Sequence, residues 1–345
     1  MCVMKLIIQI CCLNEARTLP ETLGDLPRSV PGFDAVEWLV VDDGSTDETS
    51  AVARQCGVDH VIRHSHRRGL ARAFETGINA CLDRGADVIV NTDADNQYAG
   101  SCVADICRPI LEGRADMVIG SRPIGEMEDF SWTKKRLQRL GSWFMRRLTG
   151  TTLADATSGF RAFTRELALS MNVTSDFTYA LESLVAASQQ RFRLADVPIR
   201  INPATRPSRL FGSSAEYILR QLVILLRVYT MYRPLRVFFG AGGLAIGAGV
   251  LLAVRYYFYM LAGEGKGHVQ SVIVAGLLLN IGVLLCMMGL LADIIRSNRF
   301  FLERIHSRVR RLEDREEKGV SGTTMSAESP LAMSPQQDHQ ETGLT

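Results

Sequence analysis

The chain lacks a strong excess of charge of either sign. Its 39 Lys and Arg are offset by 37 Asp and Glu, which leaves a formal net charge of +2 over 345 residues. A nucleic-acid-binding protein is expected to carry a marked basic excess on one face. We therefore expect no nucleic acid among its partners.

The chain also lacks cysteines at the CxxC spacing of zinc sites. Most of its eight cysteines stand inside apolar runs, and only Cys11 and Cys12 are adjacent. Disulfide frameworks belong to oxidising compartments and usually to short secreted chains. We therefore expect buried free thiols in a reducing compartment.

What the chain does contain is an alternation of strand-like and helix-like segments. Apolar and β-branched runs occur at 5–12, 37–43, 59–63, 86–91 and 115–120, with helical stretches such as 49–56 and 69–85 between them. This alternation is typical of an α/β domain, with a mostly parallel sheet and helices on both faces.

Polar side chains follow three of the strand-like runs: Asn14 and Glu15, Asp42 and Asp43, and Asp93 and Asp95. Ligands of open parallel sheets bind beyond the carboxyl ends of the strands. Each pair alone also fits a turn or a helix cap. Three such pairs at one edge of the sheet predict a binding site.

The stretch NTDADNQY, residues 91–98, places two carboxylates two residues apart. If the strand continues through them, Asp93 and Asp95 share one face and point together beyond its end. Paired carboxylate oxygens suit a hard divalent cation. An ordinary turn stabilised by Asp and Asn side chains is the alternative.

The chain changes character after Arg206. Residues 237–254 and 269–292 carry no charge, and at about 1.5 Å per residue each can cross a bilayer core of roughly 30 Å, the first by continuing through Arg255. These segments predict two transmembrane helices joined by the short connector AGEGKGH, and two buried core helices are the alternative. Arg255 lies beside an aromatic interfacial anchor of Tyr256, Tyr257 and Tyr259.

Basic residues are unevenly distributed around this hairpin. The connector offers Lys266, whereas six arginines flank the outer ends: Arg227, Arg233, Arg236, Arg296, Arg299 and Arg304. The positive-inside rule then predicts an integral membrane protein with its sheet domain in the cytoplasm, most simply at a bacterial inner membrane. Gly243 and Gly247 permit close helix contact, which leaves room for a homo-oligomer through these helices.

We expect five regions along the chain. Residues 1–210 form the α/β domain, 211–234 an interfacial amphipathic helix, 235–298 the transmembrane pair, 299–318 a charged cytoplasmic helix and 319–345 a disordered tail. The alternative for the amphipathic segment is a helix packed on the sheet domain.

Six motifs in order resemble one enzyme family: LNEARTL, VVDDGSTDET, RRGLARAFETG, NTDADNQY, GSR and DATSGFRAF. They resemble family 2 glycosyltransferases of the GT-A fold, a Rossmann-like sheet, and within them the dolichyl- and undecaprenyl-phosphate glycosyltransferases. The resemblance covers about residues 5–210 and continues through a two-helix anchor. This chain departs from the pattern at Tyr98 and Ala99, where many relatives carry His and Pro.

The resemblance implies an inverting, metal-dependent hexosyltransferase. It moves one sugar from a UDP- or GDP-linked donor to a polyprenyl phosphate at the cytoplasmic face of the bilayer. The alternatives are another lipid or glycan acceptor, or an inactive nucleotide-sugar-binding module. A processive polysaccharide synthase carries a QxxRW motif and more membrane spans, and this sequence has neither.

The resemblance also implies roles on the donor side. Asp93, Asp95 and Gln97 hold Mg²⁺ or Mn²⁺, and the nucleotide contacts Asn14, Glu15, Asp42, Asp43, Gly69 and Asp93. Asp42 equally fits a cap for the helix after GST, and a glycine that opens a helix, as Gly69 does, needs no ligand to explain it.

The acceptor phosphate has a second pKa of about 6, so its oxygen is already largely anionic near neutral pH. The protein must therefore bind this phosphate with cationic side chains more than it must supply a base. The candidate phosphate-binding residues are Arg122, Lys134, Arg136, Arg139, Arg206 and Arg209. The run KKRLQR also fits a solvated helix face or a contact to anionic lipid. Asp155 resembles a position proposed as the base, so Asp155 and Arg122 are the candidate catalytic residues. Asp155 equally fits a role in orienting Arg161 or a nearby loop.

Overall fold

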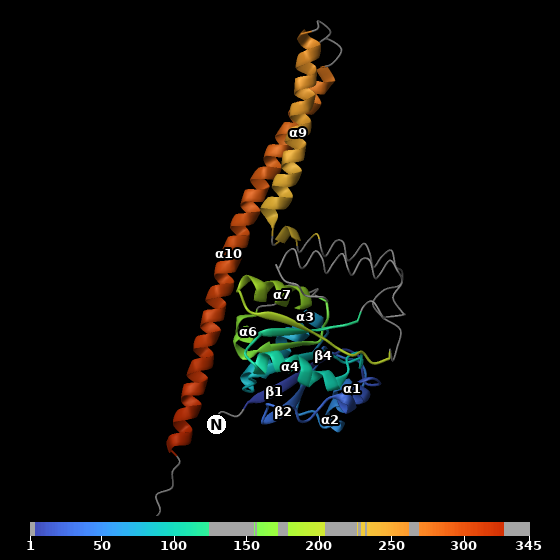
Figure 1. The fold of residues 1–345 in the computed structure, drawn as a ribbon, viewed down its shortest axis with the longest axis vertical. Coiled ribbons are helices and arrows are strands. Elements are labelled where there is room, and N and C mark those ends of the chain that lie inside the picture. The colour runs from blue at the N-terminus through green and yellow to red at the C-terminus, as the bar shows by residue number, and fades with distance from the viewer. Residues whose placement is uncertain are drawn as a thin grey trace, which may run out of the picture.

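The computed structural model describes residues 4–123, 155, 157–171, 179–203, 226, 229–231, 233–261 and 269–327. An α/β domain forms the lower part of the molecule in Figure 1, and two long helices, α9 and α10, rise from it. The alternation of segments in the sequence is thus confirmed as an α/β domain followed by a helical hairpin.

The α/β domain is built on a seven-stranded sheet with strand order β3-β2-β1-β4-β6-β5-β7. Only β6 runs antiparallel to its neighbours β4 and β5, and the other pairings are parallel. The strands are β1 Lys5–Cys12, β2 Ala35–Asp42, β3 His60–Arg63, β4 Val88–Asp93, β5 Met117–Ser121, β6 Arg161–Thr164 and β7 Leu194–Pro198.

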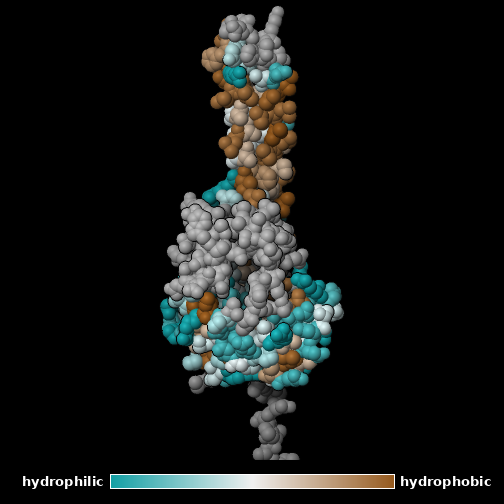
Figure 2. Space-filling view, turned by 90° about the vertical axis from the view of Figure 1, so that its right-hand side faces the viewer, coloured by the Kyte–Doolittle hydropathy of each residue, from teal (hydrophilic) through white to brown (hydrophobic). Residues whose placement is uncertain are grey.

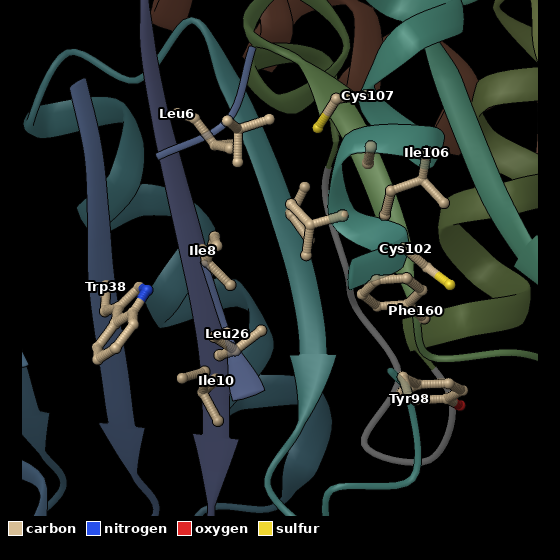
Figure 3. Close-up of a cluster of buried hydrophobic side chains, with 14 of the residues drawn as sticks. Leu6, Ile8, Ile10, Leu26, Trp38, Tyr98, Cys102, Ile106, Cys107 and Phe160 are labelled. Atoms are coloured by element: carbon tan, nitrogen blue, oxygen red, sulfur yellow. The ribbon is translucent and has the colours of Figure 1, made fainter. Parts of the chain in front are cut away.

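Helices cover both faces of this sheet. They are α1 Leu19–Asp25, α2 Thr49–Gln55, α3 Leu70–Asp83, the short 3₁₀ helix η1 Gly100–Cys102, α4 Val103–Leu111, α6 Arg165–Ser170 and α7 Tyr179–Gln189. Successive side chains of β1 point to opposite faces of the sheet, as in any β-strand. Ile7 packs toward α3, α6 and α7, while Leu6, Ile8 and Ile10 pack toward α1 and α4 (Figure 3).

The hairpin consists of α9 Pro234–Leu261 and α10 Val269–Ala327. Residues 234–261 and 270–299 are long and apolar enough to cross a membrane, with mean hydropathy of 2.2 and 2.4. On the face that Figure 2 shows, this part of the molecule is largely apolar, with polar residues near its two ends. Arg255 lies over the Tyr259 ring, in agreement with the expected interfacial anchor.

The two helices approach closely at glycines seven residues apart. A Cβ on Gly242 would lie 2.8 Å from the Gly282 oxygen, and one on Gly249 would lie 3.0 Å from the Ala275 oxygen. Ala275, Gly282 and Gly289 repeat the same heptad on α10, which keeps the small residues on one seam.

Gly243 and Gly247, which we expect to permit close helix contact, do not provide the contact between α9 and α10, and their role in a homo-oligomer stays a prediction. Both have open space around them, since a Cβ added at either position meets nothing within 4 Å. Gly243 is rotated by about 100° from Gly242 around the helix axis, and this turns it away from α10.

The second helix continues far beyond the apolar segment. α10 extends as a helix to Ala327 and contacts α6 of the α/β domain as it passes (Figure 1). We expected the helix to end at residue 318 and a disordered tail to begin at residue 319, but α10 continues to Ala327. Extending an existing helix fixes the conformation of one more residue and gains one more hydrogen bond, which is less costly than starting a helix. The predicted amphipathic segment 211–234 lies almost wholly outside the described residues.

Candidate active site at the carboxyl edge of the sheet

The three polar strand ends predicted from the sequence lie side by side. β1 is placed between β2 and β4, so Cys12 pairs with Asp42 and Cys11 pairs with Asp93. The strand order runs from β1 outward through β2 to β3 and then resumes on the other side of β1 with β4. Open α/β sheets bind their ligands at such a switch point.

Asp93 and Asp95 come together through a turn, not through strand alternation. β4 ends at Asp93, and the chain then turns through Asn96, which has a φ of 56°. Asp95 Oδ1 accepts a hydrogen bond of 3.2 Å from the backbone N of Gln97. The expectation of a continuous strand is thus wrong, because the Asp and Asn side chains favour a local turn.

The Asp93 carboxylate occupies a partly buried, strongly polar position. Burial raises the pKa of Asp93 to about 6, assisted by the negative charge of Asp95 and opposed by Arg122 and by a hydrogen bond from Tyr98. Two carboxylates that repel each other in this way fit a divalent cation, which neutralises both. Among the described residues, no group of three or more His, Cys, Asp or Glu side chains is placed so that it could hold a metal ion, and the assignment of Asp93 and Asp95 as metal ligands stays a prediction.

The first polar strand end is held by hydroxyl groups from the loop after β2. Asn14 has a φ of 55°, accepts a hydrogen bond from Thr46 N at 2.8 Å and donates its own backbone N–H to Ser45 Oγ at 2.9 Å. Glu15 is buried, and its Oε2 accepts from Thr18 Oγ1 at 2.7 Å. The loops after β1 and β2 are thereby fixed to each other.

Asp42 and Asp43 support two different loops. The buried Asp42 accepts hydrogen bonds from Ser45 N at 2.7 Å and from the Ser50 hydroxyl in the first turn of α2. The N-cap residue of α2 is Glu48, so Asp42 supports the turn before this helix and does not cap it. Asp43 accepts from Arg68 N at 2.9 Å and from Gly69 N at 2.8 Å.

Gly69 precedes the first residue of α3 and has a φ of 98°, which side chains disfavour. This conformation lets its backbone N–H point at Asp43. His64 Nδ1 lies 2.8 Å from the same carboxylate, so the loop 64–69 is anchored at both ends.

Asp155 forms a bidentate ion pair with Arg122, a partner that the sequence analysis did not assign to it. Arg122 Nε and Nη2 donate to the two carboxylate oxygens at 2.7 and 3.3 Å, and Nη2 also donates to Thr157 Oγ1 at 3.1 Å. Burial acts to raise the pKa of Asp155, but the Arg122 guanidinium and Thr157 outweigh it, so the pKa is lowered. Asp155 is therefore an ionised carboxylate that fixes the orientation of Arg122.

Sequence reasoning missed a buried polar network behind the site. Gln9 Nε2 donates to Asn91 Oδ1 at 2.9 Å, and Asn91 Nδ2 donates to the Gly159 oxygen at 2.8 Å and to the Tyr179 hydroxyl at 3.1 Å. The available signal was a polar residue inside each of two apolar strands, KLIIQICC and VIVN. This network fixes Gly159 directly behind Asp93.

The structural role of Arg161 was also not predicted from the sequence. Its side chain is fully buried, and its guanidinium donates to the backbone oxygens of Ser158 and Ala180 and to Ser183 Oγ. Burial lowers the pKa of Arg161 to about 10. The residue thus ties the 155–160 segment to α7. Lys134, Arg136, Arg139, Arg206 and Arg209 lie outside the described residues.

Comparison with known proteins identifies the family. The model of glycosyl transferase family 2 matches residues 7–169. The undecaprenyl-phosphate mannosyltransferase of Micrococcus luteus is 31% identical over 57% of this chain and 83% of its own length. The glycosyltransferase AglJ of Haloferax volcanii is 31% identical over 82% of this chain and 91% of its own length.

The solved structures agree with this assignment at the level of the fold. Glucosyl-3-phosphoglycerate synthase from Mycobacterium tuberculosis, in complex with Mn²⁺, UDP and its product, superposes with a TM-score of 0.50 at 21% identity, over 64% of this chain and 80% of that protein. The GT-A architecture expected from the sequence is thus confirmed. The chain belongs to glycosyl transferase family 2, groups there with the polyprenyl-phosphate glycosyltransferases, and is an enzyme.

Proposed function

We propose that this enzyme transfers a single sugar from a nucleotide-sugar donor to a polyprenyl phosphate at the cytoplasmic face of a membrane, with inversion and with a divalent cation. The observation that carries the proposal is the placement of the Asp93–Asp95 pair and the Asp155-oriented Arg122 at one sheet edge, in a chain that also has an apolar hairpin. Relatives named polyprenol monophosphomannose synthase and undecaprenyl-phosphate mannosyltransferase support the acceptor class.

On the donor side, Asp93, Asp95 and the amide oxygen of Gln97 hold Mg²⁺ or Mn²⁺. Such a cation, held by these residues, would supply Lewis-acid stabilisation of the charge on the departing nucleoside diphosphate. A solved GT-A relative contains Mn²⁺ together with UDP, which supports this choice of metal. The protein itself contributes the turn after β4, in which Asp95 accepts a hydrogen bond from the backbone N of Gln97.

The nucleotide contacts the loops after β1 and β2. Asn14 and Glu15 lie at the end of β1, and their fixed positions suit contacts to the base and the ribose. Asp43 and Gly69 shape the adjacent loop, while Asp42 supports the turn beneath it. These residues act by positioning the donor, because preorganised groups reduce the entropy lost on binding.

On the acceptor side, Arg122 binds the lipid phosphate by charge-assisted hydrogen bonds. An acceptor oxygen that is already anionic attacks the anomeric carbon directly, from the side opposite the leaving group, and this inverts the configuration. A general base works best with a pKa near the operating pH. The lowered pKa of Asp155 therefore favours its role as the group that orients Arg122 over the role of base.

A transfer assay tests this function. Membranes that contain the full chain are incubated with a panel of radiolabelled UDP- and GDP-sugars and with polyprenyl phosphate, and the lipid fraction is extracted. We expect label in a polyprenyl-phosphate sugar, dependent on Mg²⁺ or Mn²⁺, with the anomeric configuration inverted by NMR. Label that enters a glycan and never the lipid would refute the acceptor assignment.

A further inference from the structure

The part of α10 beyond its apolar span carries large apolar side chains that are exposed. The span ends at Arg299, but four apolar residues that follow it are 45–67% exposed: Leu302, Ile305, Val309 and Leu312. We call these four residues the distal stripe. The contact between α10 and α6 leaves the distal stripe uncovered. Apolar side chains gathered in this way on a protein surface indicate an interaction site.

The spacing of the distal stripe is that of a coiled coil. Its residues are three, four and three positions apart in one helix, and this is the spacing of the a and d positions of a heptad. The exposed Ile295 and Asn298 continue the same positions toward the apolar span, and Phe301 flanks the stripe at a g position. An a/d stripe is the seam of a coiled coil, so it fits a second helix laid along it.

Lipid does not account for the distal stripe. A helix that binds a membrane surface lies in the plane of that surface, whereas α10 is one helix from Val269 to Ala327 that runs on past the α/β domain (Figure 1). Leu312 lies 13 residues beyond Arg299, which is about 20 Å along the helix. The stripe therefore leads away from the bilayer, where its apolar side chains meet water or another protein.

The charges beside the distal stripe favour a parallel partner of the same sequence. Arg308 stands at a g position, and Glu313 stands at the e position of the next heptad. These two positions face each other between parallel strands of a coiled coil. An antiparallel pair would instead bring the g positions together, and residues 308 and 315 at those positions are both arginine. Two copies held in one membrane by the same hairpin are also parallel.

We propose that α10 pairs with α10 of a second copy of this chain through residues 295–312, as a parallel coiled coil that extends away from the bilayer. This surface is separate from Gly243 and Gly247, which lie within the membrane hairpin. The proposal concerns assembly, and it does not depend on the sugar donor or acceptor of the enzyme.

Disulfide crosslinking of the full chain in membranes of the expression host tests this pairing. Ile305→Cys places a thiol at a d position, where the two helices face each other, and Ser307→Cys places one at the f position, on the opposite side of the same helix. After mild oxidation, we expect Ile305→Cys to give a band at twice the mass of the chain. This band should be several-fold stronger than in Ser307→Cys or in the parent, which reports the background from its own eight cysteines.

No such band in Ile305→Cys would overturn the proposal, and so would equal bands in both variants, which indicate random collision. Crosslinking of Ile305→Cys to a protein of another mass would identify a different occupant and would overturn the proposal too. If Ile305→Cys does not insert into the membrane, Leu312→Cys replaces it, because residue 312 is also at a d position, and the same outcomes decide.

A charge exchange then tests the parallel arrangement. Arg308→Glu, added to Ile305→Cys, places two acidic residues opposite each other between the strands, and we expect the crosslinked fraction to fall. Further addition of Glu313→Arg restores opposite charges, and we expect the crosslinked fraction to recover. A fraction that Arg308→Glu leaves unchanged, or that Glu313→Arg does not restore, would overturn the parallel pairing.

Discussion

The ion pair between Asp155 and Arg122 leads to a prediction at the scale of single residues. The pKa of Asp155 is lowered in the folded protein, so this carboxylate is ionised throughout the range from pH 5 to pH 9. It contributes stability above its unfolded pKa of about 3.9, and this stability is lost as the pH falls below that value. The titration of Asp155 therefore cannot produce a change in rate near pH 6.

Asp155→Asn should accordingly lower the transfer rate without moving the acid limb of the pH profile. The amide loses the bidentate charge pair that orients Arg122, whereas the groups with pKa values near 6, the lipid phosphate and Asp93, are unchanged and still set the limb. Initial rates from pH 5 to pH 9 for the parent and the variant measure this. Disappearance of the acid limb in the variant would identify Asp155 as the general base.

Gly159 supports a second prediction at this scale. A Cβ at this position would lie 2.9 Å from Asp93 Oδ2 and 2.8 Å from the Tyr179 hydroxyl. Gly159→Ala should therefore displace Asp93 and destabilise the domain by about 1–3 kcal/mol through overpacking. Chemical denaturation and Mn²⁺ titration measure the two effects.

The matched control for Gly159→Ala is Gly24→Ala. Gly24 lies in helix α1, and a Cβ there meets nothing within 4 Å. The added methyl group should stabilise the helix slightly, since alanine exceeds glycine in helix propensity by up to about 1 kcal/mol. Similar losses in both variants would mean that the contact with Asp93 is not the cause.

The individual residues show where sequence reasoning ends. The acidic strand ends were predictable because the carboxyl ends of neighbouring parallel strands meet at one edge. The pairing of Asp155 with Arg122 was not, because 33 residues separate them in the chain and no local pattern specifies such a contact. The burial of Arg161 could not be predicted either, because it depends on hydrogen-bond acceptors that α7 contributes.

At the scale of elements, the segments rich in apolar residues were predicted with nearly correct limits. The run 86–91 became β4 Val88–Asp93, and 69–85 contains α3 Leu70–Asp83. The antiparallel strand β6 was not predicted, because its four residues are too short to show a period. The glycines that line the contact between α9 and α10 were not predicted, because the rotation of a helix that is apolar on all sides cannot be read from composition.

The observed seam predicts the effect of two neighbouring substitutions in α9. Gly242→Ala places a Cβ 2.8 Å from the Gly282 oxygen and the Cys286 sulfur, whereas Gly243→Ala meets nothing within 4 Å. We expect Gly242→Ala to force α9 and α10 apart and to cost about 1–3 kcal/mol, and Gly243→Ala to be neutral. Thermal unfolding of the two proteins in detergent compares them, and a larger loss for Gly243→Ala would place the interface on the other face.

At the scale of the whole molecule, the α/β domain with its candidate active site is connected to the hairpin. Arg299 at the base of α10 donates to Met231, which precedes α9, so the two ends of the hairpin lie together. α10 then continues past the α/β domain and contacts α6 (Figure 1). A chain arranged in this way keeps its sheet domain on the side of the membrane where both hairpin ends emerge.

The last prediction concerns which side that is. Arg233 and Arg236 precede the apolar part of α9, and Arg296 and Arg299 end the apolar part of α10, whereas the connector between the helices carries Lys266. The positive-inside rule therefore places both hairpin ends in the cytoplasm. In a bacterial host, alkaline phosphatase fused after residue 265 should be active, because the connector is exported. The same enzyme fused after Ala327 should be inactive, while green fluorescent protein at that point should fluoresce. The reverse pattern would place the α/β domain outside, where it could not reach a cytoplasmic nucleotide sugar, and would refute the proposed orientation.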